Sequence, residues 1–330
     1  MLANGCVLGG IPSPVFFPSV SSVAKNRWSV VDHIELLVTV NHPQFLVSAL
    51  DINKHSSDQR LVKALKQANF QEQIIIYDSG VYEMVWGHND NWSKQKYIET
   101  LRNNAFSQAF DLDSYCFNSN ADATQIINSI QETESQLRKN SISPILHCKS
   151  INEYREKCLK LSSSLTPGVI AIPERELGEG LIEITRNIKK LRSTLNELTE
   201  YQPIHILGTG NPLSLLAYSF AGADSFDGLD WCQTVVDYDT GTLHHSLHLD
   251  LYMHQSKWGN ESSLDFHTRC YLHNLEFYEN WMKIIRNCNT YESMKELINL
   301  YFSNKCYDKL IDILTIDDTT LREPHEALSD

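Results

Sequence analysis

The chain has 330 residues, of which 42% are hydrophobic and 21% are charged, as in ordinary globular proteins. Its formal net charge of −13 excludes the generally basic surface with which most nucleic-acid-binding proteins displace counterions from phosphate. It also has no apolar run long enough for a membrane span, no signal-peptide pattern in its first ten residues and no dense framework among its eight cysteines, so we predict a cytoplasmic protein.

Short apolar segments alternate with helical patterns along most of the chain. The predicted strands cover residues 15–20, 45–52, 73–78, 107–113, 144–148, 168–174, 203–209 and 225–230. Apolar residues three and four positions apart predict helices between several of them, around 61–68, 126–137, 182–198 and 213–221. Eight such alternations predict an α/β fold with a closed (β/α)8 TIM barrel. The alternative is an open doubly wound sheet, which requires an early glycine-rich phosphate loop.

Polar residues stand at the C-terminal ends of five predicted strands: Asp78, Asp111, His147, Glu174 and Asp227. In a (β/α)8 barrel this face holds the active site, although each residue taken singly could instead cap the following helix. We predict that Asp78 and Asp227 face each other across one pocket. Two such carboxylates suit covalent chemistry at an anomeric carbon, or they could bind a divalent metal, and their spacing leaves both open.

After Asp230 the alternation ends. Residues 231–269 are rich in His, Asp, Tyr and Gly, and amphipathic helices are predicted over 272–287, 291–302 and 306–314. We therefore predict a catalytic barrel over 1–230, a rebuilt excursion with C-terminal helices packed on the barrel over 231–316, and an acidic tail over 317–330.

Basic residues gather in two segments, one holding Lys149, Arg155, Lys157 and Lys160, the other Arg186, Lys189, Lys190 and Arg192. We interpret both as solvated helix faces in preference to a local nucleic-acid footprint.

Several motifs resemble the tRNA-guanine transglycosylase family, from about Gly10 to Arg286. The segment 11–18 resembles the family's opening T-P-V-F-M-P strand, and Asp78-Ser79-Gly80 resembles the start of its D-S-G-G-F-Q motif. The most specific pair is 205–210, similar to H-x-x-G-x-G, followed by 222–227, similar to G-x-D-M-F-D. Further likenesses lie at 109–111, a strand ending in an aspartate, and at 273–278, which is similar to H-N-L-x-x-Y.

The resemblance implies a role for each matching residue. Asp227 would be the nucleophile on C1′, and Asp78 the general acid/base. The implied base-binding residues are Asp111, His147, Glu174, Glu179, Gly208 and Gly210, where His147 replaces the family's glutamine and Glu174 lies in Pro173-Glu174-Arg175, which replaces its G-G-L. The implied reaction is base exchange without backbone cleavage, with the target base turned out of its stack.

Two regions depart from the family. Its P-T-R-x-x-R stretch, whose arginines meet tRNA, corresponds to residues 231–236, which contain no arginine. Its cysteine-rich zinc site is also altered. The residues His245, His248, Cys270 and His273 are compatible with one structural Zn²⁺, but zinc could equally have been lost, and His244, His254 and His267 stand nearby.

These departures are most similar to the DNA-modifying 7-deazaguanine branch of the family, called DpdA-like. The resemblance therefore implies a DNA-guanine transglycosylase that takes a 7-deazaguanine such as preQ0 or a derivative, needs no organic cofactor, could work with a helicase-like protein partner and could be virus-encoded. The alternatives are a tRNA enzyme of unusual type, a non-catalytic nucleic-acid-binding partner subunit, and an unrelated barrel hydrolase with a metal at the same aspartates.

Overall fold

A curled sheet of eight parallel strands forms the centre of the protein. The computed structural model describes residues 6–7, 10–24, 28–86, 91–112, 122–138, 141–302 and 304–315. The spatial order of the strands is β7-β6-β5-β4-β3-β10-β9-β8. Their bounds are β3 (Val15–Val20), β4 (Gln44–Ser48), β5 (Ile74–Asp78), β6 (Gln108–Phe110), β7 (Ile142–Ser143), β8 (Ile170–Pro173), β9 (Ile204–Leu207) and β10 (Ser225–Gly228).

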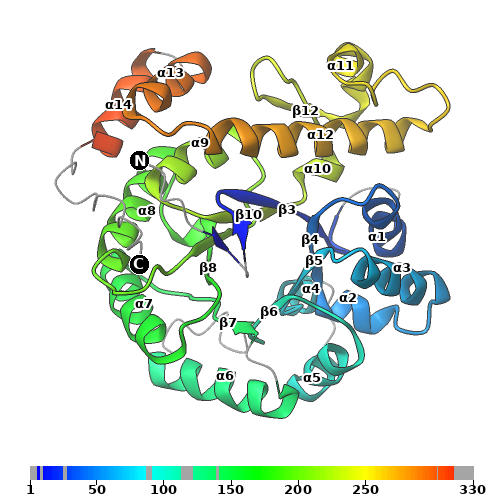
Figure 1. Ribbon diagram of the computed structural model, residues 1–330, viewed down its shortest axis with the longest axis vertical. Coiled ribbons are helices and arrows are strands. Elements are labelled where there is room, and N and C mark those ends of the chain that lie inside the picture. The colour runs from blue at the N-terminus through cyan, green and yellow to red at the C-terminus, as the bar shows by residue number, and fades with distance from the viewer. Residues whose placement is uncertain are drawn as a thin grey trace, which may run out of the picture.

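The two ends of this sheet, β7 and β8, meet at one isolated parallel bridge between Ile145 and Ala171. There the Leu146 amide donates to the Ala171 carbonyl, and the Ala171 amide donates to the Pro144 carbonyl, both at 2.9 Å. The sheet thus curls into a TIM-like barrel, as the alternation of strands and helices predicts (Figure 1). We call this junction the seam.

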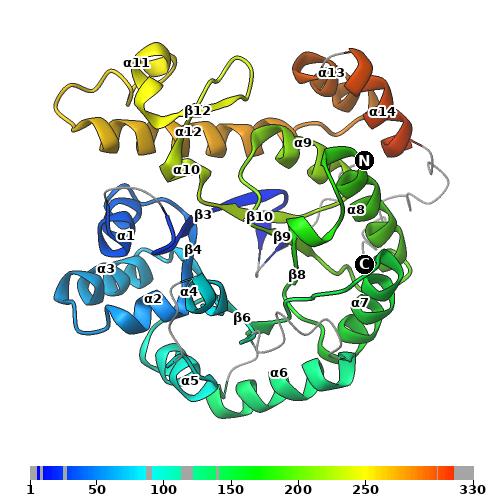
Figure 2. The same ribbon diagram turned by 180° about the vertical axis from the view of Figure 1, so that it is seen from behind.

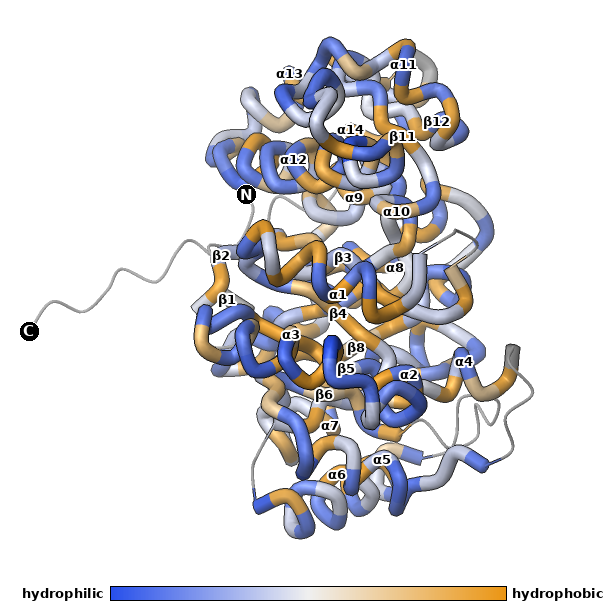
Figure 3. The backbone as a smooth tube through the Cα atoms, turned by 90° about the vertical axis from the view of Figure 1, so that its right-hand side faces the viewer, coloured by the Kyte–Doolittle hydropathy of each residue, from blue (hydrophilic) through white to orange (hydrophobic). Residues whose placement is uncertain are grey.

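Helices surround the barrel as a ring, which Figures 1 and 2 show from opposite sides. They are α1 (Val30–Thr39), α2 (Ala49–Lys54), α3 (Gln59–Phe70), α4 (Val81–Trp86), α5 (Lys94–Asn103), α6 (Ala123–Leu137), α7 (Ile151–Leu165), α8 (Leu181–Leu195) and α9 (Pro212–Ala221). Along the outer helices the hydropathy alternates between polar and apolar, because one face of each packs inward (Figure 3). Within the described ranges, no helix combines the length and apolar character that crossing a bilayer requires.

The alternation of side chains along each strand divides the core in two. One cluster fills the barrel interior: Val15, Phe17, Leu46, Ile76, Phe110, Val169 and Ala171. The intervening residues, such as Phe16, Phe45 and Tyr77, belong to the larger cluster between the strands and the helices. Residues two positions beyond an inward-facing one also face inward, so this register determines which polar side chains reach the mouth of the barrel.

Most predicted strands are longer than those of the structure, and two of them differ most. The strand expected over 45–52 ends at Ser48, because the Ser48 side chain accepts from the Asp51 amide and so caps α2. The strand expected over 144–148 is replaced by β7 at Ile142–Ser143. Pro144 has no amide hydrogen to continue the ladder, and only Ile145 pairs onward.

Beyond β10 the chain builds a layer outside β3 and α9. It contains α10 (Asp230–Gln233), the hairpin of β11 (Thr234–Val236) and β12 (Leu243–His245), then η2 (Ser246–His248), α11 (Leu249–Tyr252), η3 (Met253–Gln255), α12 (Phe266–Arg286), α13 (Tyr291–Tyr301) and α14 (Asn304–Thr315). The predicted C-terminal helices are therefore present, and the hairpin was not predicted. The long α12 lies along one side of the ring (Figure 1). The predicted acidic tail, 317–330, lies outside the described residues.

Candidate active site

A cavity of about 440 Å³ lies at the mouth of the barrel. Strand-end residues from six of the eight strands line it: Ser19, Ser48, Asp78, Pro173, Leu207 and Asp227. This is the C-terminal face, where (β/α)8 barrels carry their active sites. The cavity is large enough to enclose a nucleobase-sized ligand.

The register of the strands brings Asp78 and Asp227 into this cavity together. Asp78 follows the inward-facing Ile76 by two positions, and Asp227 follows the inward-facing Ser225 by two. Both line the cavity, and the charge of Asp227 acts on Asp78. The predicted juxtaposition of these two carboxyl groups is present.

Three hydrogen bonds hold the Asp227 carboxylate in place. Its Oδ2 accepts from the Ser19 hydroxyl at 2.6 Å, and its Oδ1 accepts from the Gly208 amide at 3.0 Å. The His205 Nε2 lies 3.1 Å from the same Oδ1, while its Nδ1 is 2.8 Å from the Ser225 hydroxyl. Both carboxylate oxygens are therefore oriented before any substrate arrives.

Asp78 has a different environment. Burial raises its pKa most, the charges of Glu83 and Asp227 raise it further, and together they bring the pKa to about 8. Backbone amides of Ser79 and Gly80 only partly oppose this shift. At neutral pH Asp78 therefore holds a proton that it can give to a leaving group.

Glu83 is a third carboxyl group beside this pair, and sequence reasoning missed it. It is buried on α4, lines the cavity, and accepts a hydrogen bond from the Ser21 hydroxyl. Burial, followed by the charge of Asp51, raises the pKa of Glu83. Its signal in the sequence is a single acidic residue inside the otherwise apolar stretch Val81–Trp86.

Glu174 also lines the cavity, as do Asp230 and Gln233. Its Oε1 accepts from the Tyr218 hydroxyl at 2.9 Å, and burial raises the pKa of its carboxyl group. Nearby, the Nδ1 of His147 is 2.7 Å from Oε1 of Glu176, whose Oε2 accepts from the Tyr154 hydroxyl at 3.0 Å. His147 and Glu174 thus lie where they were predicted, and Glu176 orients His147.

Three of the predicted base-binding residues, Asp111, Glu179 and Gly210, are not among the described residues that line the cavity. Asp111 is buried just after β6. Burial raises the pKa of Tyr97 most, and the charges of Asp111 and Asp78 raise it further, because both carboxyl groups lie near its hydroxyl. Glu179 is exposed, and its amide donates to Glu183 Oε2 at 2.8 Å.

Gly210 has a packing role beside the cavity. A Cβ at this position would lie 2.0 Å from Oδ2 of Asp230, so no larger residue fits without a rearrangement. Gly208, by contrast, lines the cavity with a φ of +77° and directs its amide to Asp227.

The four proposed zinc ligands do not form a tetrahedral site as they lie in this structure. Both ring nitrogens of His273 are hydrogen-bonded at 2.8 Å, Nδ1 to the Ser256 hydroxyl and Nε2 to the Val236 carbonyl. His245 accepts from the Leu247 amide, and Cys270 is buried on α12. Across the described ranges, no three His, Cys, Asp or Glu side chains are grouped to hold a metal ion, and zinc binding stays a prediction.

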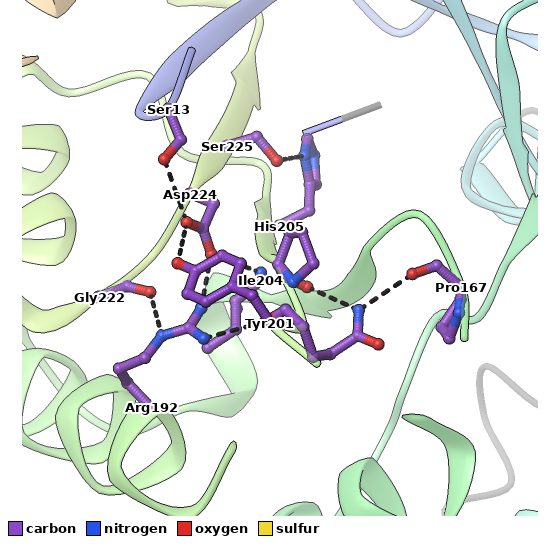
Figure 4. Close-up of polar contacts among 11 residues, drawn as sticks. Ser13, Pro167, Arg192, Tyr201, Ile204, His205, Gly222, Asp224 and Ser225 are labelled. Carbon is purple, nitrogen blue, oxygen red and sulfur yellow. Dashed lines mark hydrogen bonds and ion pairs between the residues drawn. The ribbon is translucent and has the colours of Figure 1, made fainter. Parts of the chain in front are cut away.

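A buried ion pair fixes the other end of β10 (Figure 4). Asp224 accepts from Arg192 Nη2 at 2.5 Å, from the Ile204 amide at 2.8 Å and from the Tyr201 hydroxyl. Arg192 also donates to the carbonyls of Gly222 and Gln202, both at 2.9 Å. The interpretation of Arg192 as part of a solvated basic face is therefore wrong, since its charge stabilises the strand that carries Asp227.

The fold and this cavity define a TIM-like barrel with paired carboxyl groups at its C-terminal face. A comparison with protein-family models finds no match for the chain, and a comparison with curated proteins finds none either.

Proposed function

We propose that this protein is a guanine transglycosylase that exchanges guanine for a 7-deazaguanine base in DNA through a covalent glycosyl-aspartate intermediate. The observation that supports it best is the pairing of Asp227, oriented by three hydrogen bonds, with Asp78, whose raised pKa of about 8 keeps a proton in the same cavity. A nucleophile and a general acid on one pocket suit displacement at C1′.

In the first half of the proposed reaction, an Asp227 oxygen attacks C1′ of the target nucleotide. The C1′–N9 bond breaks, its electron pair leaves with guanine, and Asp78 gives its proton to the departing base. In the second half, N9 of the incoming base loses its proton to the Asp78 carboxylate and attacks C1′. The bond between C1′ and Asp227 then breaks, which regenerates both aspartates and retains the configuration at C1′.

The segment 231–236 favours DNA over tRNA as the polymer. In tRNA enzymes of the resembled family this segment supplies arginines to the nucleic acid, whereas here Trp231, Cys232, Val235 and Val236 are buried. Such a segment offers no cationic contact to a tRNA stem-loop. A duplex substrate would have to present its guanine unstacked, so a strand-opening, helicase-like partner remains part of the proposal.

The test is incorporation of a radiolabelled 7-deazaguanine, preQ0, into single-stranded DNA, duplex DNA or tRNA. We expect label in DNA with the wild-type protein and a denaturation-stable protein–DNA adduct. Asp227→Asn should remove both the label and the adduct. Asp250→Asn, at an exposed residue of α11, is the matched control and should leave both unchanged.

Other outcomes would replace this proposal. Label in tRNA alone would indicate a tRNA enzyme of unusual type, and no label in any polymer would favour a non-catalytic partner subunit. Exchange that survives in Asp227→Asn would exclude Asp227 as the nucleophile.

A further inference from the structure

Arg175 is the one arginine or lysine among the described residues that line the cavity. It shares the cavity with five carboxyl groups, those of Asp78, Glu83, Glu174, Asp227 and Asp230. Arg175 is exposed and forms no ion pair with any carboxylate of the described residues. An unpaired cation beside so many acidic groups is available for an anionic ligand.

The side chain of Arg175 lies at the rim, opposite the loop after β5. It belongs to η1 (Glu174–Glu176), directly after β8, and its guanidinium carbon is 6.0 Å from the centre of the Tyr82 ring. Tyr82 lies on α4, directly after β5, and two strands separate β5 from β8 in the barrel. The pair therefore extends across the mouth, and both residues line the cavity, with the guanidinium at cation–π distance from the ring.

We propose that Arg175 binds a backbone phosphate of the strand whose nucleotide is turned into the cavity. This inference rests on the proposed base exchange and adds the contact that holds the polymer. When a base is extruded, its flanking phosphates stay with the backbone outside the pocket. With C1′ at Asp227, those phosphates stay near the rim, where Arg175 lies.

Electrostatics explain why such a contact matters in this chain. A phosphodiester approaching the rim meets the acidic cavity of a protein whose net charge is −13. A guanidinium offers two parallel N–H donors to phosphate oxygens, so one well-placed arginine gives both attraction and orientation. In this proposal Arg175 supplies the cationic contact to the nucleic acid that segment 231–236, which contains no arginine, does not supply.

Binding of a fluorescein-labelled single-stranded DNA 12-mer, followed by fluorescence anisotropy over a range of salt concentrations, tests this contact. Arg175→Gln should weaken binding about tenfold and reduce the salt dependence by about one phosphate contact. Arg175→Lys should restore part of the affinity, since it keeps the charge and loses the planar fork. Arg186→Gln, at an exposed arginine of α8, should bind like the wild type.

Two results would overturn the inference: a wild-type protein that does not bind the 12-mer, or an Arg175→Gln variant with unchanged affinity and salt dependence. A variant that binds DNA normally but needs more preQ0 would instead assign Arg175 to the incoming base. Failure of the proposed exchange can be told apart from failure of this inference. If DNA binding depends on Arg175 but no label is incorporated, the proposed enzyme activity is excluded and the phosphate contact stands.

Discussion

Asp78 and Asp227 both point into the cavity from near the C-terminal ends of their strands, β5 and β10. Their surroundings differ, and so does the hydrogen bonding of the two carboxyl groups. Asp227 accepts hydrogen bonds from Ser19, His205 and Gly208, which orient its carboxylate for the proposed attack on C1′. Asp78 is half-buried beside two other acidic groups, and desolvation with their charges raises its pKa, so it keeps its proton to about pH 8. A division of roles between two carboxyl groups through their environments is a recurrent way to combine acid and nucleophilic chemistry at neutral pH.

The pKa of Asp78 predicts the pH dependence of the proposed exchange. Because the proton on Asp78 is lost above about pH 8, kcat/KM should fall on the alkaline side of that value. The same group affects stability: folding raises its pKa from 3.8, so the native state holds more protons and its stability should decrease as pH rises from about 4 to 8. Initial exchange rates and urea unfolding across this range measure both effects.

Glu83→Gln tests whether the charge of Glu83 contributes to the raised pKa of Asp78. Burial of Asp78 remains while one nearby negative charge is removed, so the alkaline limb should move to lower pH by up to about one unit. Asp250→Asn, at an exposed residue of α11 that does not line the cavity, should leave the profile in place. An alkaline limb unaffected by Glu83→Gln would mean that Glu83 does not influence the acid.

At the scale of single elements, two aspartates with different functions lie in or next to β10. Asp224, just before the strand, is paired with Arg192 and anchors the strand, whereas Asp227 faces the cavity. The motif that resembles G-x-D-M-F-D therefore contains one structural and one candidate catalytic carboxylate. They lie three residues apart.

We predict that Asp224→Ala lowers the free energy of unfolding by about 3–5 kcal/mol, because it leaves the buried Arg192 charge without its partner. Urea denaturation followed by circular dichroism measures this loss. Ser13→Ala is the comparison: it removes only a 3.2 Å hydrogen bond to Asp224 and should cost about 1 kcal/mol or less. Equal losses in the two variants would show that the ion pair contributes little.

At the scale of the whole molecule, α12 joins the C-terminal layer to the barrel. The Tyr278 hydroxyl donates to the Gly210 carbonyl at 2.6 Å, and Trp281 Nε1 donates to the Pro212 carbonyl at 2.9 Å. The Tyr278 ring also stacks on Phe16 of β3 with centroids 4.2 Å apart. These buried contacts tie the layer to β3 and to the β9–α9 loop.

We predict that the barrel and this layer unfold together in urea. Tryptophan fluorescence, to which the buried Trp231 and Trp281 contribute, should change at the same urea concentration as the far-ultraviolet circular dichroism. Tyr278→Phe should lower the common midpoint, since it leaves the buried Gly210 carbonyl without that donor. Two separate transitions would instead indicate that the segments predicted as 1–230 and 231–316 are independent folding units.

The sequence alone predicts the barrel and its strand-end residues because alternation of apolar residues is a local signal. It places Asp78, His147, Glu174 and Asp227 at the mouth, and the structure brings all four to one cavity. It could not identify Ser19 and His205 as partners of Asp227, because those contacts join residues 208 and 22 positions apart. Gly210 and Asp230 likewise require the fold, since their close approach has no signature in either segment.

The seam between β7 and β8 has a consequence for which bases the cavity could accept in the proposed exchange. His147 and Glu174, which line the cavity, lie just beyond the single bridge from Ile145 to Ala171. Elsewhere the barrel wall is held by longer ladders, such as the five paired positions of β4 and β5. Widening the wall at the seam breaks few backbone hydrogen bonds, so tolerance for a bulky substituent on the base should be greatest on that side.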